Sequence, residues 1–424
     1  MAYSDSLSYL YGLERFGMIF GLEKISQLLS LLGDPHLGLR CCHVAGSNGK
    51  GSVCVMIAHV LERAYRVGLY TSPHLHSFNE RIKINGEEIS DQEVIELVEV
   101  LRGRVQEEGG PEGFTFFDFT TAMAFYYFAQ KGVDLAVVEV GLGGRLDSTN
   151  VLLPEVTVIT EVSKEHTQVL GNTLGEIAKE KGGIIKEGVP VVCGVQEGEA
   201  LEVIEEEAEG KGAELILLGR DFHFFPLGGR RLDFRGRRVR WEGLEVSLLG
   251  EHQLFNAALA LATLEVLQER GYPIGEGEIR EGLKGVVWPG RMEFVSQRPP
   301  ILLDGAHNPE GAKALAKALG ALSYRRLLLL LGIMDDKDVE GIVGEIVPLA
   351  TEVVACRPEN PRSLDPKEIA KAVLPFGPKV KVIEAVGEGL RYLMEEAQEG
   401  DLILVTGSLF TVAEAREYVL GGER

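Results

Sequence analysis

Short apolar runs bounded by glycine or polar residues recur along the first half of the chain. Such runs are typical of strands that are buried on both faces of a parallel sheet. We expect strands of this kind at 65–70, 134–140, 156–162, 189–195 and 214–218, and another that leads into residues 41–52. Apolar residues at helical spacing predict helices at 6–11, 22–32, 53–61, 91–104, 119–130, 174–181 and 252–268. The alternation predicts an α/β fold.

The pattern after residue 296 is a regular alternation of strand and helix. We expect strands at 301–303, 326–332, 352–356, 380–385 and 401–406, each followed by a helix-like stretch. This pattern predicts a small, doubly wound parallel sheet of the Rossmann-like kind. At 424 residues the chain is also too long for one ordinary core. We therefore place a first domain at 1–295 and a second domain at 296–424.

Residues 221–250 differ from their surroundings. Gly-Gly-Arg-Arg at 228–231 and Arg-Gly-Arg-Arg at 235–238 are typical of turns in a small antiparallel β insert. The six arginines from Arg230 to Arg240 allow two interpretations. They form either an anion-binding patch or the solvated face of a hairpin, and the pattern favours the hairpin.

Charge and cysteine use narrow the possible functions. The net charge of −21 argues against a nucleic-acid backbone as main partner, although one basic cleft can still hold a small anion. No apolar run approaches the roughly 20 residues of a membrane-spanning helix, and no secretion signal is recognised. Five scattered cysteines without a Cys-x-x-Cys pair predict buried side chains in a reducing cytosol. We expect a cytoplasmic protein that binds neither nucleic acid nor membrane.

A glycine-rich segment joins the expected strand before residue 46 to the helix at 53–61. Its sequence, Gly46-Ser-Asn-Gly-Lys-Gly-Ser52, has the layout of a phosphate-binding loop (P-loop), although the hydroxyl of Ser52 comes one position later after Lys50 than in the general nucleotide loop. Glycines let backbone N–H groups turn toward an anion, and the helix N-terminus adds a positive dipole. Lys50 would reach the terminal phosphates, and Ser52 would contact a phosphate or Mg²⁺. The alternative is a plain strand-to-helix turn with a surface lysine.

Glu139 lies near the end of an expected buried strand, where a carboxylate needs a partner. A metal ion is one candidate and Arg145 is the other. Once the phosphate loop is granted, the pattern favours the metal, because nucleotide sites of this type use a strand-end acid for Mg²⁺. The glycines at 141–144 resemble a dinucleotide fingerprint only weakly, because residues 145–150 suggest a loop rather than a helix.

Other polar residues follow expected strands, as ligand-binding residues do in open α/β sheets. Ser72 and His166 come after strands of the first domain. In the second domain, strand ends carry Asp304-Gly-Ala-His-Asn308, Asp335-Asp-Lys-Asp338, Arg357-Pro358 and Thr406-Gly-Ser408. A lone histidine is more often structural than a ligand, and its place at a strand end is what raises the interest in His166.

Seven segments, in this order and with these gaps, resemble the folylpolyglutamate synthase/dihydrofolate synthase group of the Mur ligase family. They are 43–52, 70–74 with 78–81, 139–147, 180–186, 288–291, 304–309 and 406–409. The resemblance runs nearly end to end. It implies a Mur-ligase-type ATP-binding domain with a P-loop and a small antiparallel β insert, followed by a C-terminal Rossmann-like glutamate-ligase domain.

The resemblance also implies a reaction. ATP phosphorylates a carboxylate of a reduced folate, and the amine of L-glutamate then displaces phosphate from the acyl phosphate. Lys50, Lys181 and His307 are the implied catalytic residues, with Lys181 carrying a carbamate. Two Mg²⁺ ions are implied: Ser72, Glu139 and His166 would ligate one, and the carbamate on Lys181 would support the second. The sequence leaves open whether dihydropteroate is a second acceptor, and whether Lys181 is only a helix-surface lysine.

Further site residues follow from the same resemblance. The ATP-binding set is Asn48, Gly49, Lys50, Gly51, Ser52, Asn256, Arg291 and Asp304. Arg291 and Asp304 flank the expected domain junction, so ATP is expected in a cleft there. The folate and the incoming glutamate are assigned to Arg81, Asp147, His307 and Ser408. The partners are thus small molecules, and we expect a monomer.

The sequence departs from the family pattern at three positions. Ser47 replaces the usual threonine, Glu165 stands where many relatives have aspartate, and Gly182 stands where alanine is common. None of these removes an implied ligand. Two other functions would also use a phosphate-binding loop. A cell-wall Mur ligase needs a larger domain before the loop than the roughly 40 residues here. A regulatory nucleotide switch would not explain His307, Ser408 or the second α/β unit.

Overall fold

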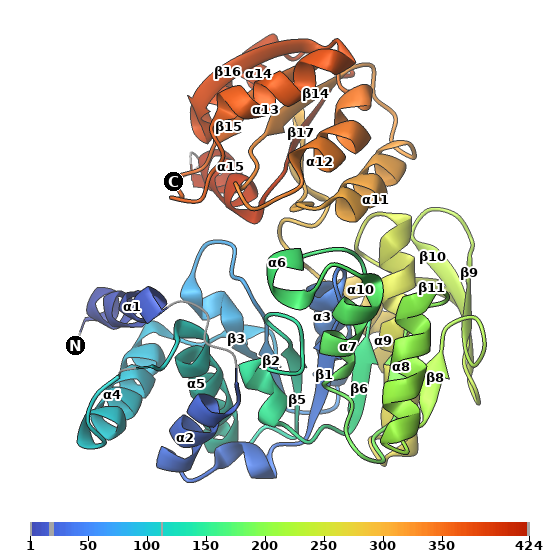
Figure 1. Cartoon of the computed structure of the whole chain (residues 1–424). Coiled ribbons are helices and arrows are strands. Elements are labelled where there is room, and N and C mark those ends of the chain that lie inside the picture. The colour runs from blue at the N-terminus through green and yellow to red at the C-terminus, as the bar shows by residue number, and fades with distance from the viewer. Residues whose placement is uncertain (1, 17–20, 112, 422–424) are drawn as a thin grey trace. The chain divides into compact units, whose positions relative to one another are not determined.

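The computed structural model describes residues 2–16, 21–111 and 113–421, in which the chain divides into two units (Figure 1). The first unit contains the chain up to Val246 together with Leu254–Val286, and the second contains Ser247–Gln253 with Val287–Arg424. The chain thus passes into the second unit after Val286, whereas the sequence analysis places the boundary at 295/296. The short segment Ser247–Gln253 belongs to the second unit although it includes the first residues of the helix Glu251–Glu269, whose Asn256 belongs to the first unit.

An eight-stranded sheet forms the centre of the first unit, in the order β4-β3-β2-β5-β1-β6-β7-β8. The strands β2, β5, β1, β6, β7 and β8 are parallel, and β3 and β4 add an antiparallel hairpin at one edge. In chain order the strands are β1 Cys41–Ala45, β2 Val67–Tyr70, β3 Ile82–Ile84, β4 Glu87–Glu88, β5 Leu135–Glu139, β6 Val156–Ile159, β7 Val191–Cys193 and β8 Leu215–Leu217.

Helices pack on this sheet as the apolar spacing predicts. The helices of the unit are α1 Tyr3–Gly12, α2 Glu23–Leu31, α3 Lys50–Leu61, α4 Asp91–Glu107, α5 Phe116–Lys131, α6 Thr167–Leu170, α7 Leu174–Gly182, α8 Glu199–Gly210, α9 Glu251–Glu269 and α10 Glu276–Gly285. Side chains of α1, α2, α4 and α5 share one apolar core with β2 and β5, and those of α7 and α8 share another with β6 and β7. α10, which the sequence analysis did not predict, packs against α3.

The predicted antiparallel insert is present as a three-stranded sheet of β9 His223–Pro226, β10 Arg231–Arg235 and β11 Arg240–Glu245. Its arginine-rich turn encloses a carboxylate. Glu265, on α9, is 3% exposed and accepts hydrogen bonds from the backbone N–H groups of Arg237, Arg238 and Val239. Arg237 also pairs with Glu214 at 2.5 Å. Carboxylates therefore already neutralise this part of the arginine run.

The second unit is built on a six-stranded sheet in the order β12-β13-β17-β14-β15-β16. The five predicted strands are parallel, and the unpredicted β12 pairs antiparallel with β13. The strands are β12 Glu293–Gln297, β13 Pro300–Leu303, β14 Leu327–Leu331, β15 Glu352–Arg357, β16 Lys379–Ala385 and β17 Leu402–Thr406. The helices are α11 Pro309–Leu319, α12 Val339–Ile346, α13 Pro366–Val373, α14 Val386–Glu396 and α15 Leu409–Gly421.

The cysteines and the lengths of the helices bear on two of the expectations from the sequence. All five cysteines are free and buried, as predicted. Among the helices that the structure describes, every one is too short or too polar to cross a bilayer.

Candidate functional site

The centre of the first sheet ends in a loop that only glycine permits at two positions. β1 lies between β5 and β6, and its chain continues through Gly46 and Gly49 into α3. Both glycines have positive φ angles, +147° and +85°. A Cβ atom on Gly46 would collide with the Thr160 side chain, and one on Gly49 would collide with Asn256. The loop is therefore packed closely against the neighbouring strand end and against α9.

Hydrogen bonds from the segment after β6 hold this loop in place. The Ser47 N–H donates to the carbonyl of Glu161 at 2.6 Å, and the Ser47 hydroxyl accepts from the Ser163 N–H at 2.9 Å. The Thr160 hydroxyl donates to the Asn48 carbonyl at 2.6 Å. Because these partners belong to the protein itself, the loop has its shape before any ligand arrives. Thr160 is a supporting residue that the sequence analysis did not identify.

Two lysine ammonium groups converge on the loop. Lys50 donates from Nζ to the carbonyls of Gly46, at 2.9 Å, and Ser47, at 3.1 Å. Lys181, on α7, is 1% exposed and donates to the same Gly46 carbonyl at 2.9 Å. The structure thus brings together two lysines that are far apart in the sequence. It also shows that Lys181 is not a helix-surface lysine.

Lys181 has an ion-pair partner, Glu165, at 2.6 Å. Burial lowers the pKa of Lys181 to about 8, with Lys50 lowering it further and Glu165 opposing the shift. Burial alone would raise the pKa of Glu165, but the nearby Lys50 and Lys181 outweigh this and hold it at about 2. Glu165 was noted from sequence only as a departure from the family pattern.

The predicted metal ligands lie at the same edge of the sheet. Glu139 is 5% exposed at the end of β5, and its Oε2 accepts from the Ser72 N–H, which follows β2, at 3.0 Å. His166 is exposed and begins α6 with a φ of +47°. Arg145, the alternative partner of Glu139, pairs instead with Glu180 at 3.4 Å and with Glu207 at 4.0 Å.

The donor chemistry of this edge suits Mg²⁺, which prefers oxygen ligands and binds through few protein groups. A carboxylate and a hydroxyl-bearing residue are brought together at Glu139 and Ser72. Within residues 2–16, 21–111 and 113–421 no cluster of three or more His, Cys, Asp or Glu side chains could hold a metal. The predicted set Ser72, Glu139 and His166 contains only two residues of these four types, because its third ligand is a serine. The set therefore stays a prediction.

The glycine run after β5 does not begin a helix. Asp147 folds back on it, with Oδ2 accepting from the Leu142 N–H at 2.9 Å and Oδ1 accepting from the Thr149 N–H at 3.0 Å. Burial raises the pKa of Asp147 even though these hydrogen bonds oppose the shift. A 3-10 turn, Ser148–Val151, follows. The run therefore lacks the helix N-terminus on which a dinucleotide site depends.

Arg81 ends the 3-10 turn Phe78–Arg81 and is 8% exposed. Its Nε donates to Nδ1 of His74 at 2.7 Å, and its guanidinium lies 5.2 Å from the centre of the Phe116 ring. The Thr71 N–H donates to the Arg81 carbonyl at 3.1 Å. Arg81 thus belongs to the same strand end as Ser72.

In the second unit, Arg291, Asp304, His307 and Ser408 lie around the ends of β13 and β17. Asp304 is buried and accepts from the Met292 N–H at 3.0 Å and from the Ala306 N–H at 2.9 Å. The His307 ring Nδ1 lies 2.9 Å from the Gly305 carbonyl. Ser408 caps α15, because its hydroxyl accepts from the Thr411 N–H at 3.1 Å. Asn256, the remaining residue of the predicted ATP-binding set, belongs to the first unit.

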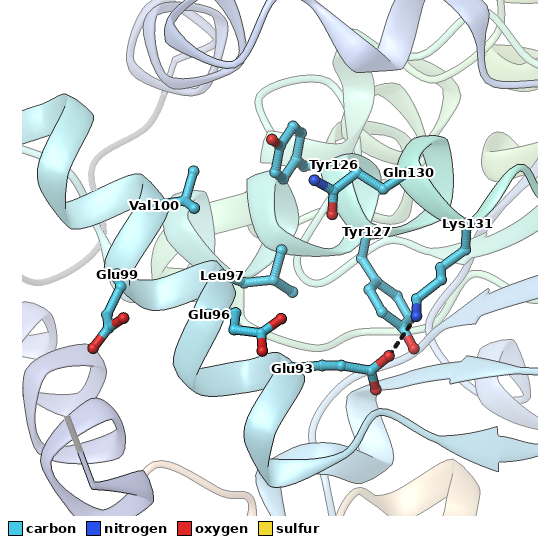
Figure 2. A pocket seen from close by; sticks show the side chains of 9 residues that line it. All are labelled: Glu93, Glu96, Leu97, Glu99, Val100, Tyr126, Tyr127, Gln130 and Lys131. Atoms are coloured by element: carbon cyan, nitrogen blue, oxygen red, sulfur yellow. Dashed lines mark ion pairs between the residues drawn. The ribbon is translucent and has the colours of Figure 1, made fainter.

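A separate groove of about 550 Å³ runs between α4 and α5 (Figure 2). Side chains of both helices line it, among them Glu93, Glu96 and Glu99 on α4. Glu93 pairs with Lys131 of α5 at 2.6 Å. None of the predicted site residues lines this groove.

Comparisons with known proteins match both units. The Mur ligase middle domain matches residues 44–264, and the Mur ligase glutamate ligase domain matches residues 290–409. The dihydrofolate synthase/folylpolyglutamate synthase of Bacillus subtilis is 37% identical, over 98% of this chain and 99% of the relative.

Solved structures agree over the whole length. Escherichia coli FolC in complex with DHPP and ADP has a TM-score of 0.91 at 31% identity, covering 100% of this chain and 99% of its own. Mycobacterium tuberculosis folylpolyglutamate synthase complexed with ADP and AMPPCP has a TM-score of 0.91 at 35% identity, covering 98% and 99%. The chain therefore belongs to the Mur ligase family, and within it to the folylpolyglutamate synthase/dihydrofolate synthase group of ATP-dependent ligases.

Proposed function

We propose that this ligase adds L-glutamate to a reduced folate through an acyl phosphate, with ATP as the phosphoryl donor. The observation that carries the proposal is the rigid loop at 46–52 with Lys50 and Lys181 on its Gly46 carbonyl. Phosphoryl transfer needs positioning and neutralisation of charge more than covalent help. The loop, held in shape by hydrogen bonds within the protein, provides the positioning, and the Lys50 ammonium provides positive charge for the phosphates.

The residues of the first unit have separate parts in this proposal. Loop N–H groups and Lys50 would hold the β- and γ-phosphates, and Asn256, which contacts the loop at Gly49, would support the nucleotide. Ser72, Glu139 and His166 would hold Mg²⁺, which neutralises phosphate charge when bound. Arg81 and Asp147 would bind the folate.

Lys181 is proposed to carry a carbamate and thereby to support a second Mg²⁺. A lysine reacts with carbon dioxide only as the neutral amine. With its pKa lowered to about 8, Lys181 offers far more neutral amine near pH 7.5 than an ordinary lysine. Carbamate formation turns the positive charge of Lys181 into a negative one and would break its ion pair with Glu165. Glu165 therefore stabilises the unmodified form of Lys181.

The second unit is proposed to contribute Arg291 and Asp304 to ATP, and His307 and Ser408 to the incoming glutamate. The ends of parallel strands, where these residues lie, are the usual ligand sites of open α/β sheets. The protein is proposed to act as a cytoplasmic monomer on small molecules, with neither nucleic acid nor membrane as a partner.

The test is incubation of the full chain with ATP, Mg²⁺ and L-glutamate, offering tetrahydrofolate or dihydropteroate separately, with products read by mass. We expect addition of one or more glutamyl residues to tetrahydrofolate together with release of ADP and phosphate. The dihydropteroate arm decides whether the second activity is present. ATP hydrolysis that proceeds equally without acceptor and glutamate would contradict the proposal and favour a nucleotide switch.

A further inference from the structure

The 3-10 turn Phe78–Arg81 ends in a buried guanidinium that forms no ion pair with any carboxylate among the described residues. Arg81 is 8% exposed, and its one hydrogen bond among the described residues runs from Nε to His74. None of the ion pairs between described residues includes Arg81. Its two terminal nitrogens therefore carry four N–H donors for which residues 2–16, 21–111 and 113–421 supply no acceptor.

The neighbours of Arg81 in the turn are fully engaged elsewhere. Asn79 donates to the Ile89 carbonyl at 2.7 Å and to Asp91 at 2.9 Å. Glu80 closes the preceding loop by accepting from the N–H groups of residues 75, 76 and 77 at 2.6 to 2.9 Å. The acid beside Arg81 in the sequence is thus not its counter-ion. The terminal polar atoms of Asn79 and Glu80 thus have partners within the protein, whereas the terminal nitrogens of Arg81 have none among the described residues.

The guanidinium is nevertheless held in one orientation. His74 fixes Nε, and the Phe116 ring lies 5.2 Å from the guanidinium carbon. Phe116 is itself stacked on Tyr11, with ring centres 5.6 Å apart. Arg81 keeps 8% of its surface exposed, and its terminal nitrogens are not among the described solvent-inaccessible side-chain atoms that lack a hydrogen-bond partner. An oriented, accessible donor group on a rigid support is what a binding residue requires.

A buried cation without a counter-ion costs free energy. Burial lowers the pKa of Arg81, and the nearby Tyr70, Tyr11, Glu139 and Glu14 oppose this shift only in part. A folded protein keeps such a group where a bound anion supplies the missing charge. Glu139 is one of the charged groups that act on Arg81, so Arg81 lies near the predicted metal ligands Glu139 and Ser72.

We propose that the terminal nitrogens of Arg81 bind a carboxylate of the pterin-bearing acceptor in a two-point contact. This inference rests on the proposed function, because that function supplies the carboxylate. Arginine matches a carboxylate with two parallel N–H···O bonds, whereas lysine offers only a point charge. The Phe116 and Tyr11 rings would line the same position with an apolar surface.

Two carboxylates of the acceptor have this chemistry. One is the group that ATP phosphorylates, and the other is the α-carboxylate of a folate that already carries glutamate. Dihydropteroate has only the first, and tetrahydrofolate monoglutamate has both. The two acceptors therefore separate the two sources.

The experiment compares Arg81→Met and Arg81→Lys with the wild-type chain and with Arg102→Met. Arg102 is a matched control, because its guanidinium lies 5.2 Å from the Tyr9 ring but on the exposed face of α4. For each protein we would measure KM for both acceptors and for ATP, the binding of each acceptor by calorimetry without ATP, and urea unfolding.

We expect Arg81→Met to weaken acceptor binding at least 20-fold, with ATP KM within threefold of wild type and no loss of resistance to urea. Arg81→Lys should restore little, because the two-point contact is lost. If Arg81→Met weakens the binding of both acceptors, Arg81 binds the carboxylate that is phosphorylated. If it weakens the binding of tetrahydrofolate alone, Arg81 binds the α-carboxylate. Unchanged binding of both acceptors would overturn the inference, as would a lowered unfolding midpoint that alone accounts for weaker binding.

The control separates this result from a failure of the proposed function. If the wild-type chain and Arg102→Met form glutamylated product while Arg81→Met binds acceptor normally, only the Arg81 inference fails. If wild type forms no product and binds no acceptor, the proposed function fails first.

Discussion

Lys50 and Lys181 donate to one and the same carbonyl oxygen, that of Gly46, each at 2.9 Å. One lysine comes from the start of α3 and the other from the end of α7, so the carbonyl joins two elements that flank the loop. Two ammonium groups this close repel each other, and Glu165 offsets part of that repulsion. The arrangement is poised to accept further negative charge, as a triphosphate would bring.

Replacing Lys50 with alanine should abolish ligation with either acceptor. The phosphates would lose their main side-chain cation, and removal of one such preorganised group typically costs about 10²- to 10³-fold in kcat. The measurement is product formation by mass at saturating substrates. Lys284→Ala, which removes an exposed lysine of α10, is the control and should behave as wild type. Near-normal turnover of Lys50→Ala would mean that the phosphate loop is wrongly assigned.

Carbamate formation on Lys181 should depend on pH in a direction set by its lowered pKa. The neutral amine is the reactive form, so at fixed dissolved carbon dioxide it becomes available as pH rises through about 8, well below the usual lysine value of 10.5. A ¹³C carbamate signal from labelled bicarbonate would follow this rise. Glu165 raises the pKa of Lys181, so Glu165→Gln should move the rise to lower pH. A carbamate signal that survives in Lys181→Ala would contradict the assignment.

Alanine at Gly49 should weaken ATP binding by two separable effects. The residue would sit at a φ of +85° and would also collide with Asn256. The positive φ alone costs about 1–2 kcal/mol. Gly228 has a φ of +87° with nothing within 4 Å of an added Cβ, so Gly228→Ala reports that cost by itself. We expect Gly49→Ala to lose at least as much stability as Gly228→Ala, and the KM for ATP to rise, about tenfold, only for Gly49→Ala. Equal ATP KM values in both variants would contradict it.

The sequence predicts best those helices and strands whose apolar residues recur at regular spacing. The parallel strands and most helices lie where apolar spacing places them, because burial dictates that spacing. The sequence pattern does not predict β12 or α10, and the reason differs between the two. β12 is a half-buried edge strand with little apolar contrast, and α10 is a polar helix with glycines at both ends. The passage of Ser247–Gln253 into the second unit has no local signal, since it depends on long-range packing.

The candidate site shows a similar division. Spacing identifies the loop glycines and Lys50, because the backbone conformation there demands glycine. The contact of Lys181 with Gly46 joins residues 135 positions apart, and no sequence period encodes it. The same holds for Thr160, which supports Asn48 from the neighbouring strand end. Arg81 was identified by resemblance, whereas its missing counter-ion became visible only in three dimensions.

The β insert should depend on Glu265. This carboxylate accepts three backbone N–H groups of the turn at 237–239, and hydrogen bonds to a charged group typically contribute about 1.5–3 kcal/mol each. Because the three share one acceptor, we expect Glu265→Ala to lower the free energy of unfolding by about 3 kcal/mol. Urea unfolding would measure this loss, with Glu276→Ala, at the exposed first position of α10, as the control. An unchanged unfolding midpoint would show that the turn holds its shape without Glu265.

Ser408 should affect both stability and the use of glutamate, and two substitutions can separate the effects. Its hydroxyl accepts from the Thr411 N–H at the start of α15, and loss of such a cap costs about 1 kcal/mol. Ser408→Ala should therefore lower the unfolding free energy by about that amount and raise the KM for L-glutamate. Asparagine can also cap a helix, so Ser408→Asn should recover most of the stability. If the hydroxyl contacts the incoming glutamate, the KM of Ser408→Asn stays high although the helix is restored. If the raised KM returns to the wild-type value together with the stability, Ser408 acts only as a cap and its assignment to glutamate is wrong.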